Sequence, residues 1–418
     1  MDSLCIEGGQ QLKGEVLVPS SKNASLPLMC LSLLTAEPVH IENLPDVSDI
    51  KSLKLLLESL GVQESEPGHL HCREIHSTLA PYDLVRKMRA SIMVLGPLLA
   101  RAGKAEVSLP GGCAIGERPI DIHLKGLAAL GAEIKLEAGY VHARAERLRG
   151  AKIDLGFPTV TGTINVVMAA SLAEGETNLE NCAREPEVVE CIQVMRKMGA
   201  DIEGEGTSNI RIRGKSSLSG VKWKVQSDRI QFLTYLAAGA ITRGDVTCYP
   251  YRDGSLDLVF EKFREMGCKI IQTGDRIRLK SETSFRPIEI ETAPFPGFPT
   301  DGQAQVMACL CLGAQDVGRS HIRENVFENR FQHVSELRRM GADIRLRNNL
   351  ASIQGVEYLS GASVMASDLR ASASLVLAGL AAQGKTEVLR VYHLDRGYEL
   401  MESKLKALGA KIWRADQQ

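Results

Sequence analysis

The sequence has no long hydrophobic segment and almost no net charge. Its longest apolar run, near residues 26–36, is far shorter than the roughly 20 residues that span a bilayer. Fifty Lys and Arg against 51 Asp and Glu leave a net charge of -1, which argues against bulk attraction to nucleic acid or an anionic membrane. The start, Met1-Asp2-Ser3, leads into folded-looking sequence without the parts of a secretory signal. We therefore expect a cytoplasmic protein with no nucleic-acid or membrane partner.

Disulfide and metal-binding patterns are also missing. The ten cysteines are scattered along the chain, and Cys309-x-Cys311 fits neither zinc nor thioredoxin spacing. No paired His/Cys ligand motif is present. We expect reduced thiols and no metal site.

A repeat of about 70 residues is the main positive feature. The 418 residues are 44% hydrophobic and 24% charged, which is typical of a globular enzyme with two or three domains. Six glycines, 68 to 74 residues apart, each end a helical pattern and begin a strand pattern. They are Gly61, Gly131, Gly199, Gly267, Gly341 and Gly409.

Each repeat also contains an Ala-rich segment almost without charge. Residues 169–175, 237–244 and 378–384 are the clearest of these segments, and we expect them to be buried helices. The unit is then a buried helix, a strand, a surface helix and a strand hairpin. Six units favour two closed α+β domains of three units each. An open array is the alternative, but solenoid repeats are usually about 20 to 50 residues long.

The loop 108–123 carries the strongest sign of chemistry. Pro110 and three glycines prevent regular structure, so we expect an exposed, mobile loop with Cys113 near its tip. Most cysteines are small buried hydrophobes, but the flanking glycines and prolines favour a functional thiol here. Arg118 offers a planar guanidinium suited to phosphate or carboxylate.

Other charged residues stand at the starts of expected helices. Lys22 and Asn23 could bind an anion there, although simple capping by Ser21 or Asn23 is at least as good an interpretation. Arg89 opens an apolar run and needs an anionic partner. Asp301 follows a proline-rich turn, where its carboxylate could be a helix cap or a general base.

Three further arginines precede or open helices, and each has an acid within two residues. For each of Arg330, Arg370 and Arg396 alone, the simpler interpretation is a local salt bridge that adds little to stability. Their shared position suggests instead that they converge on one cleft.

Several stretches together resemble the enolpyruvyl transferase family, and most closely its members that act on UDP-N-acetylglucosamine. The resemblance covers essentially the whole chain. It rests on these motifs: Lys22-Asn23, Pro110-Gly-Gly-Cys-x-Ile-Gly-x-Arg-Pro-x-Asp-x-His123, Arg184-Glu-Pro-Glu-Val188, Phe298-Pro-Thr-Asp301, Val326-Phe-Glu-Asn-Arg-Phe331, Asp368-Leu-Arg-Ala-Ser-Ala373 and His393-x-Asp-Arg-Gly-Tyr398.

The resemblance implies an α/β (α+β) fold, the inside-out α/β barrel with two pseudo-threefold domains, which agrees with the six repeats. It places the first domain at residues 22–228. The second is made of residues 1–21 and 229–418, because the first ~20 residues cross over to complete it.

The implied reaction moves the enolpyruvyl group of phosphoenolpyruvate to the 3-hydroxyl of UDP-N-acetylglucosamine, the first committed step of peptidoglycan synthesis. No cofactor is implied. Cys113, Asp301, Lys22 and Arg396 would be catalytic. Substrate binding would fall to these residues: Lys22, Asn23, Arg89, Arg118, Pro119, Ile120, Asp121, Ile122, Asp301, Val326, Arg330 and Arg370.

The chain departs from the family pattern at a few positions. Ile164 stands where Glu is common, and Gly302 follows Asp301 where Met is common. Two other functions stay open: a 3-phosphoshikimate 1-carboxyvinyltransferase, whose Gly-Asn-x-Gly-Thr stretch is not found here, and a non-catalytic nucleotide-sugar sensor, which would need neither Cys113 nor Asp301.

Overall fold

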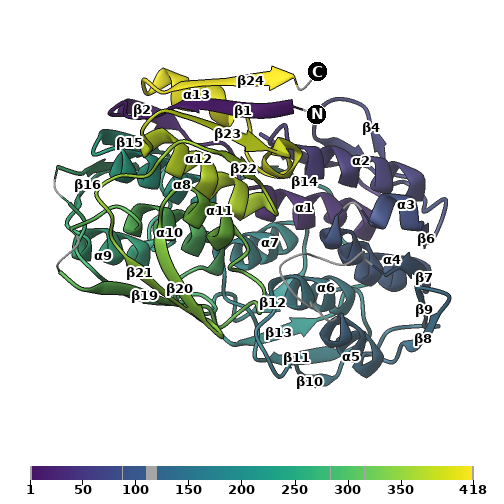
Figure 1. Ribbon diagram of the computed structural model, residues 1–418. Coiled ribbons are helices and arrows are strands. Elements are labelled where there is room, and N and C mark those ends of the chain that lie inside the picture. The colour runs from purple at the N-terminus through teal and green to yellow at the C-terminus, as the bar shows by residue number, and fades with distance from the viewer. Residues whose placement is uncertain (1, 87, 110–119, 283, 315–316, 417–418) are drawn as a thin grey trace. The chain divides into compact units, whose positions relative to one another are not determined.

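The computed structural model describes residues 2–86, 88–109, 120–282, 284–314 and 317–416. In these ranges the chain forms six four-stranded sheets, and close contacts divide it into two compact units. One unit contains residues 2–19 and 227–416, and the other contains residues 20–109 and 120–226. The inside-out barrel built from six repeats, expected from the sequence, is confirmed (Figure 1).

The six sheets share one pattern of strand pairing. Each contains one parallel pair at one edge and two antiparallel pairs. In the unit of residues 20–226 the sheets, in spatial order, are β14 (Val221–Lys224), β3 (Val39–Glu42), β5 (His69–His71) and β4 (Gln63–Glu64); β6 (Leu79–Ala80), β7 (Lys104–Ser108), β9 (Tyr140–Arg144) and β8 (Glu133–Glu137); and β10 (Lys152–Asp154), β11 (Glu176–Glu180), β13 (Asn209–Arg213) and β12 (Asp201–Glu203).

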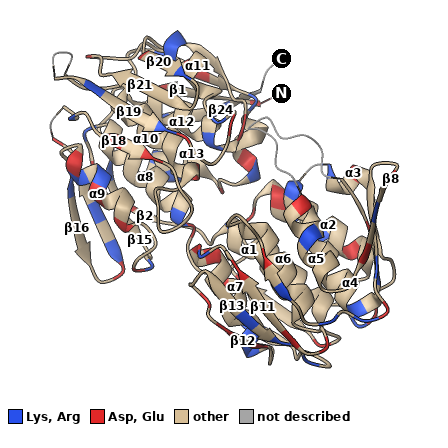
Figure 2. Cartoon of the chain, turned by 90° about the horizontal axis from the view of Figure 1, so that it is seen from below, with Lys and Arg blue, Asp and Glu red and all other residues tan. Residues whose placement is uncertain are grey.

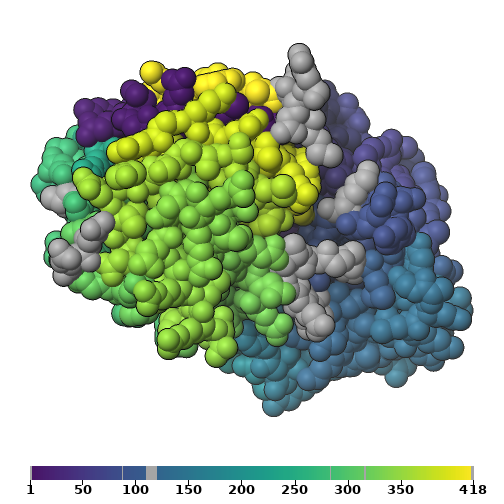
Figure 3. All heavy atoms as spheres, in the orientation of Figure 1, coloured from purple at the N-terminus to yellow at the C-terminus, as the bar shows by residue number. Residues whose placement is uncertain are grey.

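The other unit repeats this arrangement with strands from both ends of the chain. Its sheets are β16 (Lys269–Thr273), β17 (Arg276–Lys280), β15 (Asp245–Tyr249) and β2 (Lys13–Leu17); β18 (Glu289–Glu291), β19 (Arg319–Arg323), β21 (Leu350–Gln354) and β20 (Asp343–Arg347); and β22 (Ser363–Met365), β23 (Lys385–Leu389), β1 (Asp2–Glu7) and β24 (Lys411–Asp416). The first strand therefore lies between strands from the last 60 residues of the chain (Figures 1 and 3).

Helices form the centre and the outer cover of each unit. The central helices are α1 (Lys22–Cys30), α4 (Leu95–Ala102) and α6 (Val160–Ala170) in one unit, and α8 (Arg229–Ile241), α10 (Gln303–Leu310) and α12 (Leu369–Ala381) in the other. The remaining helices are α2 (Ser48–Leu60), α3 (Tyr82–Val85), α5 (Asp121–Ala129), α7 (Pro186–Lys197), α9 (Asp257–Glu265), α11 (His333–Arg339) and α13 (Met401–Ala407). Short 3-10 turns are η1 (Leu31–Leu34), η2 (Arg89–Val94), η3 (Thr300–Gly302) and η4 (Val391–Arg396).

The six glycines of the repeat all have the left-handed backbone that the sequence predicted. Their φ angles run from 95° at Gly131 to 111° at Gly61. A side chain is strained in this conformation, so glycine ends each surface helix and turns the chain into the next strand.

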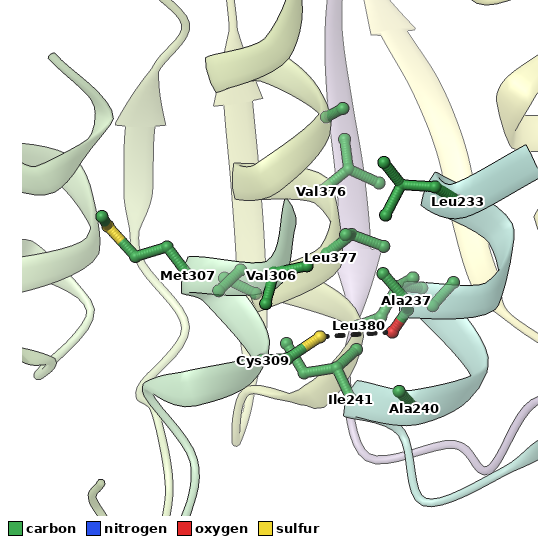
Figure 4. Close-up of a cluster of buried hydrophobic side chains, with 14 of the residues drawn as sticks. Leu233, Ala237, Ala240, Ile241, Val306, Met307, Cys309, Val376, Leu377 and Leu380 are labelled. Carbon is green, nitrogen blue, oxygen red and sulfur yellow. Dashed lines mark hydrogen bonds between the residues drawn. The ribbon is translucent and has the colours of Figure 1, made fainter. Parts of the chain in front are cut away.

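The central helices are apolar because other elements cover them on every side. Every residue of α10, and all of α12 from Arg370 to Leu380, is buried. Side chains of α8, α10 and α12 pack together, with the Cys309 thiol donating to the Ala237 carbonyl at 3.6 Å (Figure 4). Lys, Arg, Asp and Glu gather instead on strands such as β12, β13 and β16 (Figure 2).

Truncating one of these core side chains should destabilise the unit of residues 227–416. Leu377 in α12 is fully buried, so Leu377→Ala should lower the free energy of unfolding by about 2–5 kcal/mol. The control is Leu17→Ala in β2, where the side chain is 61% exposed and the change should stay within about 0.5 kcal/mol. Urea unfolding measures both. Equal costs would contradict a central position for α12.

Candidate active site

Asp301 is held by two buried arginines in the unit of residues 227–416. It lies in η3, directly before α10. Its Oδ1 accepts a hydrogen bond from Arg330 Nη2 at 2.8 Å, and its Oδ2 accepts from Arg370 Nη2 at 2.8 Å and Nε at 3.1 Å. The arginine side chains are only 4% and 3% exposed, whereas that of Asp301 is 27% exposed. The carboxylate is therefore the accessible end of a rigid cluster.

The alternative of local salt bridges is wrong for Arg330 and Arg370, since both pair with Asp301 instead. Asp368, two residues before Arg370, caps α12: its Oδ1 accepts from the backbone N–H groups of residues 370 and 371 at 2.8 and 3.0 Å. Asp395, the neighbour of Arg396, binds Arg414 Nη1 at 3.0 Å. Arg396 itself is the last residue of η4.

Arg370 stays a cation despite its burial. Burial alone would lower the pKa of its guanidinium, but the negative charge of Asp301 opposes this and raises the pKa above its usual range. The two guanidinium groups in turn stabilise the carboxylate form of Asp301. An ionised carboxylate only accepts hydrogen bonds, so it is suited to a substrate hydroxyl or N–H.

Glu324 links Asp301 to the turn that contains Val326. It is buried just after β19, and its Oε2 accepts from the Thr300 hydroxyl at 2.9 Å. Its Oε1 accepts from the Thr292 hydroxyl at 2.9 Å and from the backbone N–H groups of Val326 and Phe327 at 2.9 and 3.0 Å. One carboxylate thus fixes both Thr300 and the backbone of residues 326 and 327.

Packing explains why glycine, rather than the common Met, stands at position 302. A Cβ placed on it would lie 2.4 Å from Leu233 Cδ2 of α8, which is closer than real contacts allow. With Leu233 in its present rotamer, there is no room for a side chain at Gly302. Met at this position would need a different arrangement of Leu233.

Lys22 forms a buried ion pair in the unit of residues 20–226. Its Nζ lies 3.1 Å from Asp49 Oδ2 of α2, and both side chains are at most 10% exposed. The α1 cap is Ser21, whose side chain accepts from Ala24 N, so the capping interpretation holds for Ser21. Asn23 is the second residue of α1 and is partly buried.

Arg89 and residues 120–122 lie near a hydrogen-bonded histidine. Asn165 in α6 accepts from Gly96 N through Oδ1 at 2.7 Å, so its Nδ2 is the donor to His123 Nδ1 at 3.0 Å. The His123 proton is then on Nε2, which donates to Thr161 Oγ1 at 3.3 Å. Burial, together with the positive charge of Arg89, lowers the pKa of His123 to about 4.

This network anchors the stretch expected to bind a nucleotide sugar. Arg89 begins η2, and Ile120 precedes α5, which contains Asp121 and Ile122. A neutral His123 accepts from Asn165, and a protonated ring could not.

Three predicted site residues, Cys113, Arg118 and Pro119, lie outside the described residues, as do Pro110 and the glycines of the same loop. The nine other cysteines are all buried. Burial raises the pKa of Cys30, Cys182 and Cys311 to about 12. Their thiols are therefore poor nucleophiles at neutral pH.

No cluster of three metal-ligating side chains exists in the described part of the chain. Within the same residues, none of the helices combines the length and apolarity needed to cross a membrane.

Comparison with known proteins gives the family. The family model for EPSP synthase (3-phosphoshikimate 1-carboxyvinyltransferase) matches residues 6–405. A UDP-N-acetylglucosamine 1-carboxyvinyltransferase of Geobacter metallireducens is 51% identical over 423 aligned positions, which cover 100% of both chains. This chain belongs to the enolpyruvyl transferase family.

Solved structures agree with that assignment. The enolpyruvyl transferase NikO from Streptomyces tendae has a TM-score of 0.89 at 25% identity, covering 100% of this chain and 99% of its own. EPSP synthase from Acinetobacter baumannii has a TM-score of 0.75 at 19% identity, with 100% of both chains covered, and shares the fold. This enolpyruvyl transferase therefore has the architecture of its relatives throughout.

Four residues near the candidate site were not predicted from the sequence: Glu324, Asp49, Asn165 and Tyr398, whose hydroxyl accepts from Arg370 Nη1 at 3.3 Å. A signal existed for Glu324, because Ser320, Ile322 and Glu324 alternate with partly exposed residues and share the buried face of β19 and its extension. The other three give no local signal, since their partners are 27 or more positions away.

His123 should make stability depend on pH. Its folded pKa, about 4, is below the ordinary 6.5, so the unfolded chain binds the extra proton first. Stability present above pH 6.5 should be lost as pH falls towards 4, by on the order of 3 kcal/mol from this group. His123→Gln should flatten the slope of unfolding free energy against pH in that window. An unchanged slope would contradict a buried neutral His123.

Proposed function

We propose that this enzyme transfers the enolpyruvyl group of phosphoenolpyruvate to the 3-hydroxyl of UDP-N-acetylglucosamine and releases phosphate. The observation that carries the proposal is 51% identity over the full length of a UDP-N-acetylglucosamine 1-carboxyvinyltransferase. The enzyme would catalyse the first committed step of peptidoglycan synthesis, in the cytoplasm, with two small-molecule substrates and without metal or cofactor.

The reaction is an addition followed by an elimination. A proton adds to carbon 3 of phosphoenolpyruvate while the sugar hydroxyl attacks carbon 2 and loses its own proton. The resulting tetrahedral ketal then loses phosphate from carbon 2 and a proton from carbon 3, which restores the double bond. Negative charge shifts onto phosphate during these steps, so fixed cations stabilise the transition states.

Cys113 would give the proton to carbon 3, and Asp301 would take the proton of the sugar hydroxyl. The accessible, arginine-held carboxylate of Asp301 supports its part. Lys22, Arg118 and Arg396 would neutralise the phosphate and carboxylate of phosphoenolpyruvate.

The nucleotide sugar would be bound by Arg89, by residues 118–122 and by Val326. Asn23 would contribute polar contacts at the start of α1. The two buried arginines, Arg330 and Arg370, would act mainly by holding Asp301, since both guanidinium groups contact its carboxylate.

Phosphate release tests the proposed function. The purified enzyme with phosphoenolpyruvate and UDP-N-acetylglucosamine should release phosphate at least a hundredfold faster than with shikimate 3-phosphate. Asp301→Asn should lower kcat by about 10²-fold or more, as expected for loss of a general base. Faster release with shikimate 3-phosphate would favour the other carboxyvinyltransferase reaction. Binding of the nucleotide sugar without release would favour a sensor.

Alkylation tests the assignment of Cys113. The epoxide phosphonate fosfomycin should modify Cys113 alone, because the nine other cysteines are buried. Peptide mass mapping after treatment identifies the adduct. Cys113→Asp should keep turnover, since Asp can give a proton, and should escape alkylation, whereas Cys113→Ser should be nearly inactive. An adduct on another cysteine, or equal activity of the two variants, would contradict this role.

A further inference from the structure

We propose that the Tyr398 hydroxyl positions the catalytic carboxylate of Asp301 by bracing Arg370, without touching substrate. The inference rests on the proposed function, because Asp301 is assigned its role there. Tyr398 lies just after η4, in the unit of residues 227–416, and its side chain is buried.

Arg370 is held at two edges of its guanidinium group. Nε and Nη2 donate to Asp301 Oδ2 at 3.1 and 2.8 Å, and Nη1 donates to the Tyr398 hydroxyl oxygen at 3.3 Å. The guanidinium is planar, so contacts at both edges fix the rotation of the plane as well as its position. The Tyr398 contact therefore controls the angle at which Arg370 meets Asp301.

The Tyr398 hydroxyl is itself fixed. Gln305 Nε2 of α10 lies 3.3 Å from it, and Thr234 Oγ1 of α8 lies 2.9 Å from it. Because Thr234 Oγ1 gives its proton to the Ile230 carbonyl at 2.7 Å, Tyr398 donates to Thr234 and accepts from Gln305 and Arg370. Gln305 Nε2 also lies 3.2 Å from Thr234 Oγ1, so the side chains of residues 234, 305 and 398 form one hydrogen-bonded cluster.

The brace joins all three central helices of the unit. Thr234 belongs to α8, Gln305 to α10 and Arg370 to α12, and all three side chains are buried. If the Tyr398 hydroxyl is removed, the Nη1 donor of Arg370 loses its acceptor in a place where water does not replace it easily. The guanidinium can then turn, and its double contact to Asp301 weakens.

Tyr235 provides a natural contrast in the same core. It is fully buried in α8, one residue from Thr234, yet its hydroxyl has no hydrogen-bond partner among the described residues. Burial of a tyrosine in this core therefore does not by itself place its hydroxyl in a network. The contacts of Tyr398 are specific to its position.

The test compares Tyr398→Phe with Tyr235→Phe as the matched control. Each variant removes one buried hydroxyl and nothing else. We expect Tyr398→Phe to lower kcat about tenfold with little change in KM, because turnover depends on Asp301 in its working orientation. Tyr235→Phe should leave kcat unchanged. Thermal midpoints of both variants show whether folding is affected.

The pH profile separates positioning from a purely structural role. A carboxylate with weaker cation contacts protonates more readily, so the acid limb of kcat should move to higher pH by about half a unit or more in Tyr398→Phe. Thr234→Val, which removes the acceptor of Tyr398, should cause a smaller shift in the same direction. It serves as the second variant if Tyr398→Phe folds poorly.

Several results would overturn the proposal. One is a Tyr398→Phe variant with the kcat and pH profile of the wild type. Another is a loss of kcat with an unmoved acid limb, which would mean a structural role only. If the wild type releases no phosphate, the proposed function fails instead. In that case crystals of Tyr398→Phe still decide whether the brace exists, since intact Arg370 contacts to Asp301 would refute it.

Discussion

The central constraint in each unit is the burial of three helices on all sides. A helix in this position cannot present charge along its length, because an uncompensated buried charge costs too much free energy. Charged side chains are therefore left to the helix ends. Lys22 opens α1, Asp301 lies in the turn η3 directly before α10, and Arg370 lies in the first turn of α12. The positions of these three candidate site residues follow from this packing.

The contacts at the helix ends also distinguish carboxylates that cap helices from the carboxylate of the candidate site. Asp228 and Asp368 accept backbone N–H groups at the starts of α8 and α12 and are used as caps. Asp301 lies just before α10, and its carboxylate binds the buried side chains of Arg330 and Arg370. Similar residues at similar helix ends thus differ in role, because their partners differ.

The sequence predicted the repeat well because the repeat depends on local rules. Each glycine marks a helix end whose left-handed backbone is strained for a residue with a side chain, and each Ala-rich stretch marks a buried helix. Contacts between distant positions were not predictable in this way. Asp368 lies only two residues from Arg370, but the carboxylate that Arg370 binds is that of Asp301, 69 positions away. The Asp368 carboxylate accepts from backbone N–H groups of α12 rather than from the Arg370 side chain. Distance along the sequence does not reveal this choice of partner.

Glu324 shows that one such long-range pairing can hold two chain segments of the candidate site. Its carboxylate holds Thr300, the neighbour of Asp301, and also the backbone of Val326. Arg330, which follows the same turn, binds Asp301 through its side chain. Gln303 Nε2 of α10 donates to the Arg330 carbonyl at 3.1 Å. Hydrogen bonds and an ion pair therefore connect the segments around residues 300 and 326. The proposed roles, proton acceptance by Asp301 and sugar binding at Val326, would need this fixed spacing.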